Sequence, residues 1–359
     1  MPRFVFIGSY TKDEGQTDHR RDGIFTCQVS DEGQLGLLSA AASGKNPSYL
    51  AQHPTLPVLY SVNEMEADRA SAFTIDPPTG KLALINSQLT GGEWPCQISP
   101  DPTGKWLMAA NYNSGSLTIF PVLADGRIGP SSDYVQHRGV PGPDQDRQNS
   151  AHAHMIKFDP TGRFILATDL GLDRIFIYRL DEQRGRLEPH SPAEVRLPPA
   201  SGPRHFVFHP NRRFLYLANE LDSTVTACEW DGEAGELRPF QKLPTLPGGF
   251  EGVNEVADIH LHPSGRFVYV SNRGHDSLAA YAVDPRSGLL DPLGHTPTGG
   301  LFPRGFGVDP LGRFILAANQ HSDTVVTLRI DERSGQLFPT DFKLAIPRPT
   351  CVVFFSFPS

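Results

Sequence analysis

Residues 262–272 read His262-Pro-Ser-Gly-Arg-Phe-Val-Tyr-Val-Ser-Asn272, a Pro/Gly turn followed by a strand-forming run that ends in asparagine. The same pattern occurs five more times, closely at residues 159–169, 209–219 and 309–319 and more loosely at 53–63 and 101–111. The copies recur about every 50 residues, a spacing typical of propeller blades. We therefore take one copy with its flanks as the repeating unit of the fold.

Each copy is followed by a further strand and a turn. One example is the alternating run Ser223-Thr-Val-Thr-Ala-Cys-Glu-Trp230, after which comes the turn Ala234-Gly-Glu-Leu237. Short alternating runs with regular turn signals predict antiparallel strands, and no run with helical periodicity competes with them. The sequence therefore predicts an all-β fold of four-stranded antiparallel blades, whose radial arrangement protects the strand edges.

The two ends of the chain supply the parts of a seventh blade. Strand-like runs lie at residues 4–7, 23–29 and 35–40, but the first strand of this blade is missing. The apolar run at residues 350–355 is expected to supply it, because an uncovered apolar strand would promote aggregation. We predict a single seven-bladed β-propeller domain over residues 1–359, closed when the C-terminal strand joins the N-terminal blade.

Composition narrows the possible partners and the compartment. Charged residues make up 20% of the chain and the net charge is −8, so neither nucleic acid nor a membrane is an expected partner. No apolar run approaches membrane-spanning length, and Met1-Pro-Arg leads directly into a strand without a signal-peptide core, so we expect a cytoplasmic location. The four cysteines lie in different predicted blades without metal-binding spacing, which favours buried free thiols: Cys27, Cys96, Cys228 and Cys351.

Two segments stand outside the repeat, at residues 136–149 and 244–254. Each precedes the first strand of a blade. Long insertions on a rigid scaffold often carry function, and a plain linker is the alternative that the sequence leaves open.

The repeat also predicts which residues meet at the channel. The first strand of a blade lines the centre of a propeller, and the second runs back antiparallel to it. The residue six positions before the repeat proline should therefore lie beside the residue that follows the terminal Asn or Asp, always 16 positions later. These pairs are Ser48/Glu64, Cys96/Tyr112, His154/Leu170, Arg204/Glu220, Ala257/Arg273 and Arg304/Gln320, and Tyr10 holds the second position in the split blade.

One mouth of the channel should thus gather three arginines, two glutamates and a histidine. Such a cluster either binds a ligand or pairs internally, for example as an Arg204–Glu220 ion pair. Channel mouths are concave ligand sites, and guanidinium groups favour carboxylates and phosphates, so a small anionic metabolite is the expected partner. His154 and Glu220 are the candidate proton carriers. His205 is out of phase with Arg204 and should point into the blade packing.

Known motifs for metals and cofactors are missing. The chain has no HExxH, no CxxC pair and no EF-hand pattern, so a metal-free site is expected. It has no Gly-rich phosphate loop, no dinucleotide fingerprint and no serine-hydrolase elbow, because no strand–helix unit exists to carry one. We expect no cofactor.

The chain resembles the seven-bladed propeller lactonases, a family that includes bacterial 6-phosphogluconolactonase and fungal carboxymuconate lactonizing enzymes. The resemblance covers essentially the whole chain. It is carried by Gly8-Ser-Tyr-Thr11, Gly202-Pro-Arg-His205, Asn219-Glu-Leu221, Ala257-Asp-Ile-His260, Ser271-Asn-Arg273, Pro303-Arg-Gly-Phe306 and Ala317-Ala-Asn-Gln320.

The resemblance implies a lactonase that hydrolyses a sugar δ-lactone, with 6-phosphogluconolactone as the leading candidate. It implies four catalytic residues, which are His154, Arg204, Glu220 and Arg273. Arg204 and Arg273 would stabilise the oxyanion, and either His154 or Glu220 would activate the water. The expected substrate-binding residues are Tyr10, Glu64, Tyr112, Arg304 and Gln320, of which Arg304 with Gln320 would hold a phosphate or hydroxyl group.

Two other functions use the same features. A lactonizing cycloisomerase acting on a carboxylated muconate would need two arginine clamps beside Glu220, whereas a phosphorylated lactone needs donors far from Glu220. A non-catalytic propeller would bind a small anionic metabolite or a protein, and a protein-binding one should expose aromatic residues on its rim.

Overall fold

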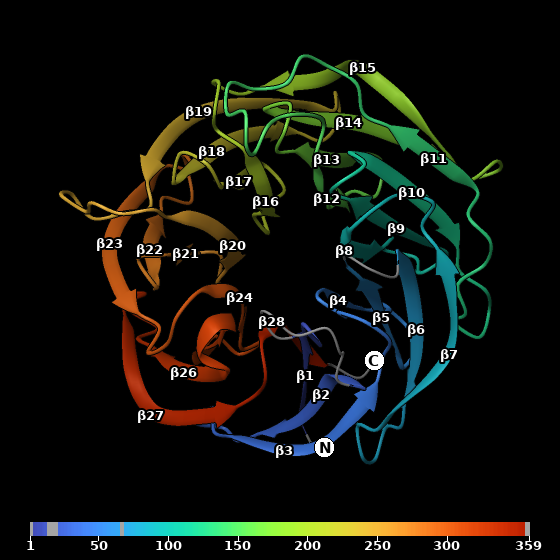
Figure 1. The fold of residues 1–359 in the computed structure, drawn as a ribbon. Coiled ribbons are helices and arrows are strands. Elements are labelled where there is room, and N and C mark those ends of the chain that lie inside the picture. Colours follow the sequence, from blue (N-terminus) through green and yellow to red (C-terminus); the bar gives the residue numbers. More distant parts are fainter. Residues whose placement is uncertain (1–2, 13–20, 65–67, 356–359) are drawn as a thin grey trace.

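The computed structural model describes residues 3–12, 21–64 and 68–355, and these residues form seven four-stranded antiparallel sheets arranged in a ring (Figure 1). Within each sheet the first strand lies nearest the centre of the ring, and the other three lie progressively farther out. The predicted all-β, seven-bladed propeller is confirmed.

Six blades are continuous in sequence. The first three contain β4 (Leu50–Gln52), β5 (Val58–Asn63), β6 (Arg69–Ile75) and β7 (Leu82–Leu89); β8 (Pro95–Pro100), β9 (Trp106–Asn111), β10 (Ser116–Pro121) and β11 (Asp133–Gln136); and β12 (Ala153–Phe158), β13 (Ile165–Asp169), β14 (Arg174–Asp181) and β15 (Arg186–Arg196). The next three contain β16 (Pro203–Phe208), β17 (Phe214–Asn219), β18 (Thr224–Asp231) and β19 (Glu236–Pro244); β20 (Glu255–Leu261), β21 (Phe267–Arg273), β22 (Ser277–Val283) and β23 (Leu290–Pro297); and β24 (Pro303–Val308), β25 (Phe314–Asn319), β26 (Thr324–Ile330) and β27 (Leu337–Ala345), with the 3-10 turn η1 (Gln320–Ser322) after β25.

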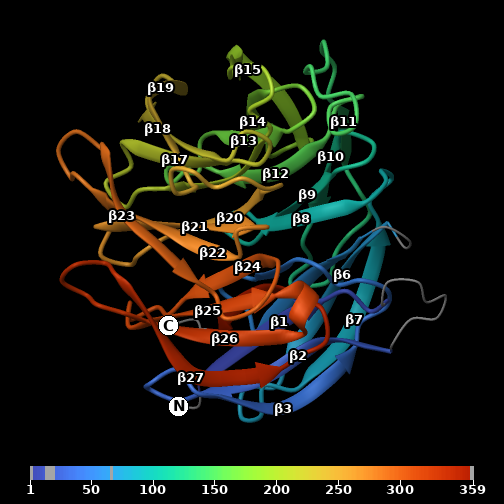
Figure 2. The ribbon, with the colours of Figure 1, turned by 60° about the vertical axis from the view of Figure 1, so that its left-hand side comes forward.

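The seventh blade closes the ring with strands from both ends of the chain. Its order is β28 (Pro349–Phe355), β1 (Phe4–Ser9), β2 (Asp22–Val29) and β3 (Leu35–Ala42). β28 pairs antiparallel with β1, so that Ile7 faces Val352. Figure 2 shows the red β27 of the preceding blade beside the blue β3 of this closing blade. The predicted non-covalent closure is confirmed.

The first residue of the repeat ties neighbouring blades together. In three copies a buried histidine ring contacts a glycine carbonyl of the next blade at 2.9–3.0 Å: His53 with Gly104, His209 with Gly265 and His262 with Gly312. A Cβ on any of these glycines would approach the ring to 2.8 Å or less. The first histidine and the turn glycine of the repeat therefore serve the contact between blades, while the other ring nitrogen of each histidine accepts from the turn of its own blade.

Apolar side chains fill the spaces between blades, as in the cluster that joins Tyr216 and Val225 of one blade to Val256 and Tyr281 of the next. All four cysteines are buried and free, as expected. In the described part of the chain we find no helix that is long and apolar enough to cross a membrane.

Candidate active site

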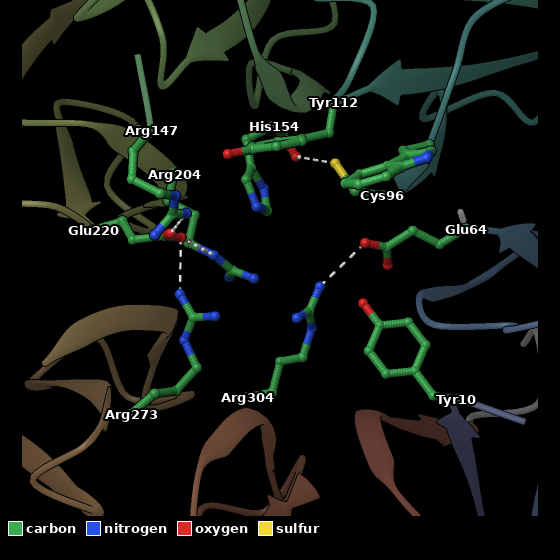
Figure 3. Close-up of a pocket in the computed structure, with 11 residues that line it drawn as sticks. Tyr10, Glu64, Cys96, Tyr112, Arg147, His154, Arg204, Glu220, Arg273 and Arg304 are labelled. Atoms are coloured by element: carbon green, nitrogen blue, oxygen red, sulfur yellow. Dashed lines mark hydrogen bonds and ion pairs between the residues drawn. The ribbon is translucent and has the colours of Figure 1, made fainter. Parts of the chain in front are cut away.

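A cavity of about 260 Å³ lies where the blades meet (Figure 3). Every blade contributes to its lining, which consists of Tyr10, Glu64, Trp94, Cys96, Tyr112, Arg147, His154, Arg204, Glu220, Arg273 and Arg304. Polar and charged groups thus converge on one small volume that seven separate sheets hold in place.

Irregular pairing in the inner strands aims several of these side chains. In β16 and β17, Pro203 pairs with Asn219 and His205 with Ala218, so Arg204 is an extra residue between them. The same shift occurs at Cys96, His154 and Arg304 in their own blades. Such a β-bulge re-aims a side chain and is common beside active sites.

The bulge also corrects the predicted register. Direct partners are 16 residues apart, as expected, but they are Pro203 and Asn219 rather than Arg204 and Glu220. The backbone N–H of Glu220 donates instead to the Gly202 carbonyl at 2.7 Å. Arg204 and Glu220 still meet through their side chains.

Glu220 is the centre of the charged cluster. Its side chain is 2% exposed and forms ion pairs with three guanidinium groups. Its Oε2 lies 2.9 Å from Nε of Arg204 and 2.9 Å from Nη2 of Arg273, and Oε1 is paired with Arg147. Burial alone would raise the pKa of Glu220, but Arg273, Arg147 and Arg204 outweigh it and lower the pKa to about 2. Glu220 is therefore a fixed anion at neutral pH.

A second, smaller charged group lies across the cavity. Nη2 of Arg304 is 3.2 Å from Oε1 of Glu64, and the Arg304 guanidinium stacks over the ring of Tyr10 at 5.0 Å. Figure 3 shows Arg304 and Tyr10 entering from one side while Glu64 reaches toward Arg304 from another. This group places a cation away from Glu220.

His154 projects its ring into the space between the two charged groups (Figure 3). His154 is buried, and its backbone carbonyl accepts a hydrogen bond from the Cys96 thiol at 3.4 Å. Burial lowers the pKa of His154 well below its usual range, and the nearby Arg204, Arg304 and Arg273 charges and the His205 ring lower it further. The imidazole is therefore neutral near pH 7 and can accept a proton.

The structure brings together eight of the nine residues that the sequence singled out. Gln320, which begins η1, is the exception because it is absent from the cavity lining. The sequence analysis did not identify Trp94 and Arg147 as lining residues, and it placed Cys96 at the channel without giving it a role. Cys96 occupies the repeat position of Arg204, so the repeat itself pointed to Cys96. Arg147 lies in the inserted segment 136–149, so the insertion was the feature that pointed to it.

Arg147 shows that this insertion reaches the site. It contacts both Glu220 and Glu255 and is 31% exposed, in contrast to the buried Arg204 and Arg273.

Metal binding has no comparable support, because nowhere in residues 3–12, 21–64 and 68–355 do three His, Cys, Asp or Glu side chains group in a way that could hold an ion.

Comparisons with known proteins identify the family to which this fold belongs. Residues 4–354 match the family model described as lactonase, 7-bladed beta-propeller. The chain is 34% identical to a Bacillus subtilis protein named 6-phosphogluconolactonase over 86% of each chain, and 37% identical to one of that name from Pectobacterium carotovorum over 80% of this chain and 81% of the other. It also superposes on the structure of a Pseudomonas aeruginosa periplasmic gluconolactonase with a TM-score of 0.92 and 34% identity over the full length of both chains.

Proposed function

The chain belongs to the family of seven-bladed β-propeller lactonases, and we propose that it hydrolyses a sugar δ-lactone, 6-phosphogluconolactone, to 6-phosphogluconate. The observation that carries the proposal is the neutral His154 beside the arginines that surround Glu220, inside a positively charged cavity. Relatives at 34% and 37% identity that carry the name of this activity support it.

The charge of the cavity fits a phosphorylated substrate. Its lining holds four arginines against two glutamates, which leaves +2 with His154 neutral. Glu255, just behind Arg147 and Arg273, reduces this to +1. The whole protein carries −8, so positive charge is concentrated at the cavity. A phosphate monoester carries about −1.5 to −2 at pH 7, and guanidinium groups bind it through paired hydrogen bonds.

We assign the base to His154 rather than Glu220. Water attacks the lactone carbonyl carbon with an oxygen lone pair, and its proton passes to a ring nitrogen of His154. Glu220 has a pKa of about 2 and three arginine partners, so it is a poor proton acceptor near pH 7. Its role is to hold Arg204 and Arg273 in position.

Arg204 and Arg273 are placed to stabilise the developing negative charge. As the carbonyl becomes a tetrahedral oxyanion, these two guanidinium groups, which are buried and fixed by Glu220, stabilise its charge. The intermediate then collapses, the ring C–O bond breaks, and His154 returns its proton to the departing oxygen. The product is an open-chain acid.

Arg304 is the arginine for the phosphate in this proposal. It lies away from Glu220, stacks on Tyr10 and is paired with Glu64. Arg147, which is the more exposed guanidinium, is available for the same group. Tyr112 adds an aromatic wall next to His154, its ring edge-on at 5.6 Å. Gln320 is left out because it lies outside the lining.

One observation favours a second candidate, the lactonizing cycloisomerase. Arg147, Arg204 and Arg273 flank Glu220, which is the arrangement expected for clamping a dicarboxylate. A protein-binding role has less support, because exposed aromatics such as Tyr134, Phe240 and Phe338 lie on the outer strands of three non-adjacent blades.

The compartment is part of the proposal. A phosphorylated metabolite and four free cysteines fit the cytoplasm. The name of the Pseudomonas aeruginosa structure contains the word periplasmic, so cell fractionation with an antibody to the chain is the direct check.

The test is a pH-stat assay with fresh 6-phosphogluconolactone, glucono-δ-lactone and a carboxymuconate, each corrected for the spontaneous reaction and run with and without chelator. We expect fast, chelator-insensitive hydrolysis of the phosphorylated lactone, a loss of about 10²-fold or more in Arg204→Ala, and full activity in His209→Gln. His209 binds Gly265 in the blade contact and lies outside the cavity. No rate above background on either lactone would refute the proposal, and turnover of the muconate alone would establish the second candidate.

A further inference from the structure

Behind His154, on the side away from the cavity, lies a buried pair formed by His205 and Asp258. We propose that this pair positions the catalytic histidine by fixing which of its two ring nitrogens carries the proton. The inference rests on the proposed role of His154 as the base, and it adds two positioning residues that the cavity lining does not contain.

His205 and Asp258 occupy the same position of the repeat in adjacent blades. His205 follows the bulged residue Arg204 in β16, and Asp258 is the second of two unpaired residues, after Ala257, in β20. Sequence alternation predicts that His205 points away from the channel wall, and it does lie outside the cavity lining. Its ring nevertheless packs edge-on against His154, with the ring centroids 5.1 Å apart.

The contact between His205 and Asp258 fixes the first proton. Nδ1 of His205 lies 2.9 Å from Oδ1 of Asp258. Burial would raise the pKa of Asp258, but His260 and His205 outweigh burial and hold the pKa well below its usual range. An ionised carboxylate can only accept hydrogen bonds. The proton of a neutral His205 must therefore sit on Nδ1.

Neighbouring groups do not reverse this assignment. Nη1 of Arg204 lies 3.4 Å from Nδ1 of His205, but the same nitrogen donates to the Ala257 carbonyl at 2.5 Å. The other oxygen of Asp258 contacts Nε2 of His260 at 3.0 Å and the Phe306 amide at 3.4 Å. Burial, followed by repulsion from Arg204, lowers the pKa of His205 to about 4, although Asp258 opposes this. His205 is thus neutral at pH 7.

One ring nitrogen of each of these two packed histidines is buried without a partner in the described part of the chain. Nε2 of His205 and Nδ1 of His154 are both buried, and neither has a hydrogen-bond partner among residues 3–12, 21–64 and 68–355. Since His205 holds its proton on Nδ1, its Nε2 is an acceptor. It is satisfied if His154 presents a donor, Nδ1–H, directly or through one bridging water. Each buried nitrogen then has a hydrogen bond that offsets the free-energy cost of its desolvation.

The consequence is a base with a defined orientation. A neutral His154 with its proton on Nδ1 has a free lone pair on Nε2, which is then the nitrogen that takes the proton from the attacking water. The imidazolium that forms keeps Nδ1–H bonded toward His205 and, through it, the Asp258 carboxylate. The proton returns from Nε2 to the leaving oxygen, so His205 and Asp258 end the cycle unchanged.

The sharpest test reads the tautomers without any substrate. Long-range ¹H–¹⁵N correlation spectra of the ¹⁵N-histidine-labelled protein at pH 7 should show His154 and His205 both protonated on Nδ1. In Asp258→Asn, whose amide can donate to Nδ1 of His205, both rings should switch to the Nε2–H form. In His205→Gln, His154 should become a mixture of both forms. His209→Gln, a buried histidine change in the same blade, should leave the His154 signal unchanged.

Kinetics give a second, separable measurement. We expect Asp258→Asn to lower kcat by about 10²- to 10⁴-fold at unchanged KM, the range in which a misplaced general base falls. The same change in a His205→Gln background should cost little more, because both residues act through one contact. Two results would overturn the inference. One is a wild-type His154 that is protonated on Nε2. The other is the same His154 tautomer in the wild type, in Asp258→Asn and in His205→Gln. If the tautomers are as expected and no lactone is hydrolysed, the positioning pair stands and the proposed function falls. If Asp258→Asn does not fold, the wild-type and His205→Gln spectra decide.

Discussion

At the scale of single residues, the site gives different roles to His154 and Glu220, which the sequence left as two candidates for the same general base. Both residues sit in the same cavity, yet their surroundings act in opposite ways. Three guanidinium groups keep Glu220 ionised, whereas the same positive field, together with burial, keeps His154 neutral. The arginines of the cavity thus keep Glu220 as a structural anion and His154 as an uncharged base.

Glu220 should contribute to stability only where it is ionised. Its pKa falls from 4.5 to about 2 in the folded protein, so the contribution is complete above pH 4.5 and is lost as the pH falls toward 2. At about 1.4 kcal/mol for each pKa unit, it amounts to roughly 3 kcal/mol. Urea denaturation should show Glu220→Gln less stable than wild type at pH 7, with the gap shrinking between pH 4.5 and 3. A gap that does not depend on pH would contradict this assignment.

The low pKa of His154 predicts an unusual pH–rate profile. A base must be deprotonated to act, and the pKa of His154 lies well below 6.5 in the free protein. With glucono-δ-lactone, which carries no phosphate that titrates at about pH 6, we therefore expect kcat/KM to stay flat from pH 8 down through 6.5 and to fall only in more acidic solution. His154→Gln should lose about 10²- to 10⁴-fold in kcat and show no such limb. A limb centred at 6.5 in the wild type would mean that the surrounding arginines do not act on the base.

At the scale of elements, the strands followed from the sequence but the aiming of the side chains did not. The period of the repeat predicted the blades, and eight of the nine candidate residues line one cavity, because the inner strand and the end of the second strand recur at fixed positions. It could not predict the bulge at Arg204 and His154, since one unpaired residue leaves the Pro and Asn signals in place. Gln320 keeps the backbone contact of the repeat, since its N–H donates to the Phe302 carbonyl as that of Glu220 does to Gly202, but its side chain is not part of the cavity lining.

The inserted segment 136–149 escaped the repeat altogether, and it supplies Arg147. Arg147→Ala removes a charged partner of Glu220 and a guanidinium from the cavity. We expect KM for the phosphorylated lactone to rise about 10- to 100-fold, the value of one charge-assisted hydrogen bond, with a much smaller change for unphosphorylated glucono-δ-lactone. Arg138→Ala is the matched control, because Arg138 is an exposed arginine in the same segment outside the lining. Equal effects of the two substitutions would show that Arg147 does not bind substrate.

At the scale of the whole molecule, the site belongs to the ring rather than to any blade. Each of the seven blades places at least one side chain in the cavity. Tyr10 follows β1, and Arg304 lies on β24, which packs beside β28. The pairing of β28 with β1 therefore holds two walls of the site together as well as the two ends of the fold.

Val352→Asp tests this coupling, because Val352 is 6% exposed in β28 and packs with Val5, Ile7 and Phe314. A buried, unpaired carboxylate there should cost several kcal/mol and open the ring at its non-covalent joint first. In urea, we expect wild-type activity and far-ultraviolet circular dichroism to disappear together, whereas the variant should lose activity at a clearly lower concentration than its strand signal. Leu311→Asp makes the same chemical change at a 65% exposed turn of the neighbouring blade and should keep the two curves together. Coincident curves in Val352→Asp would mean that the blades unfold as one unit, with no weak joint at the closure.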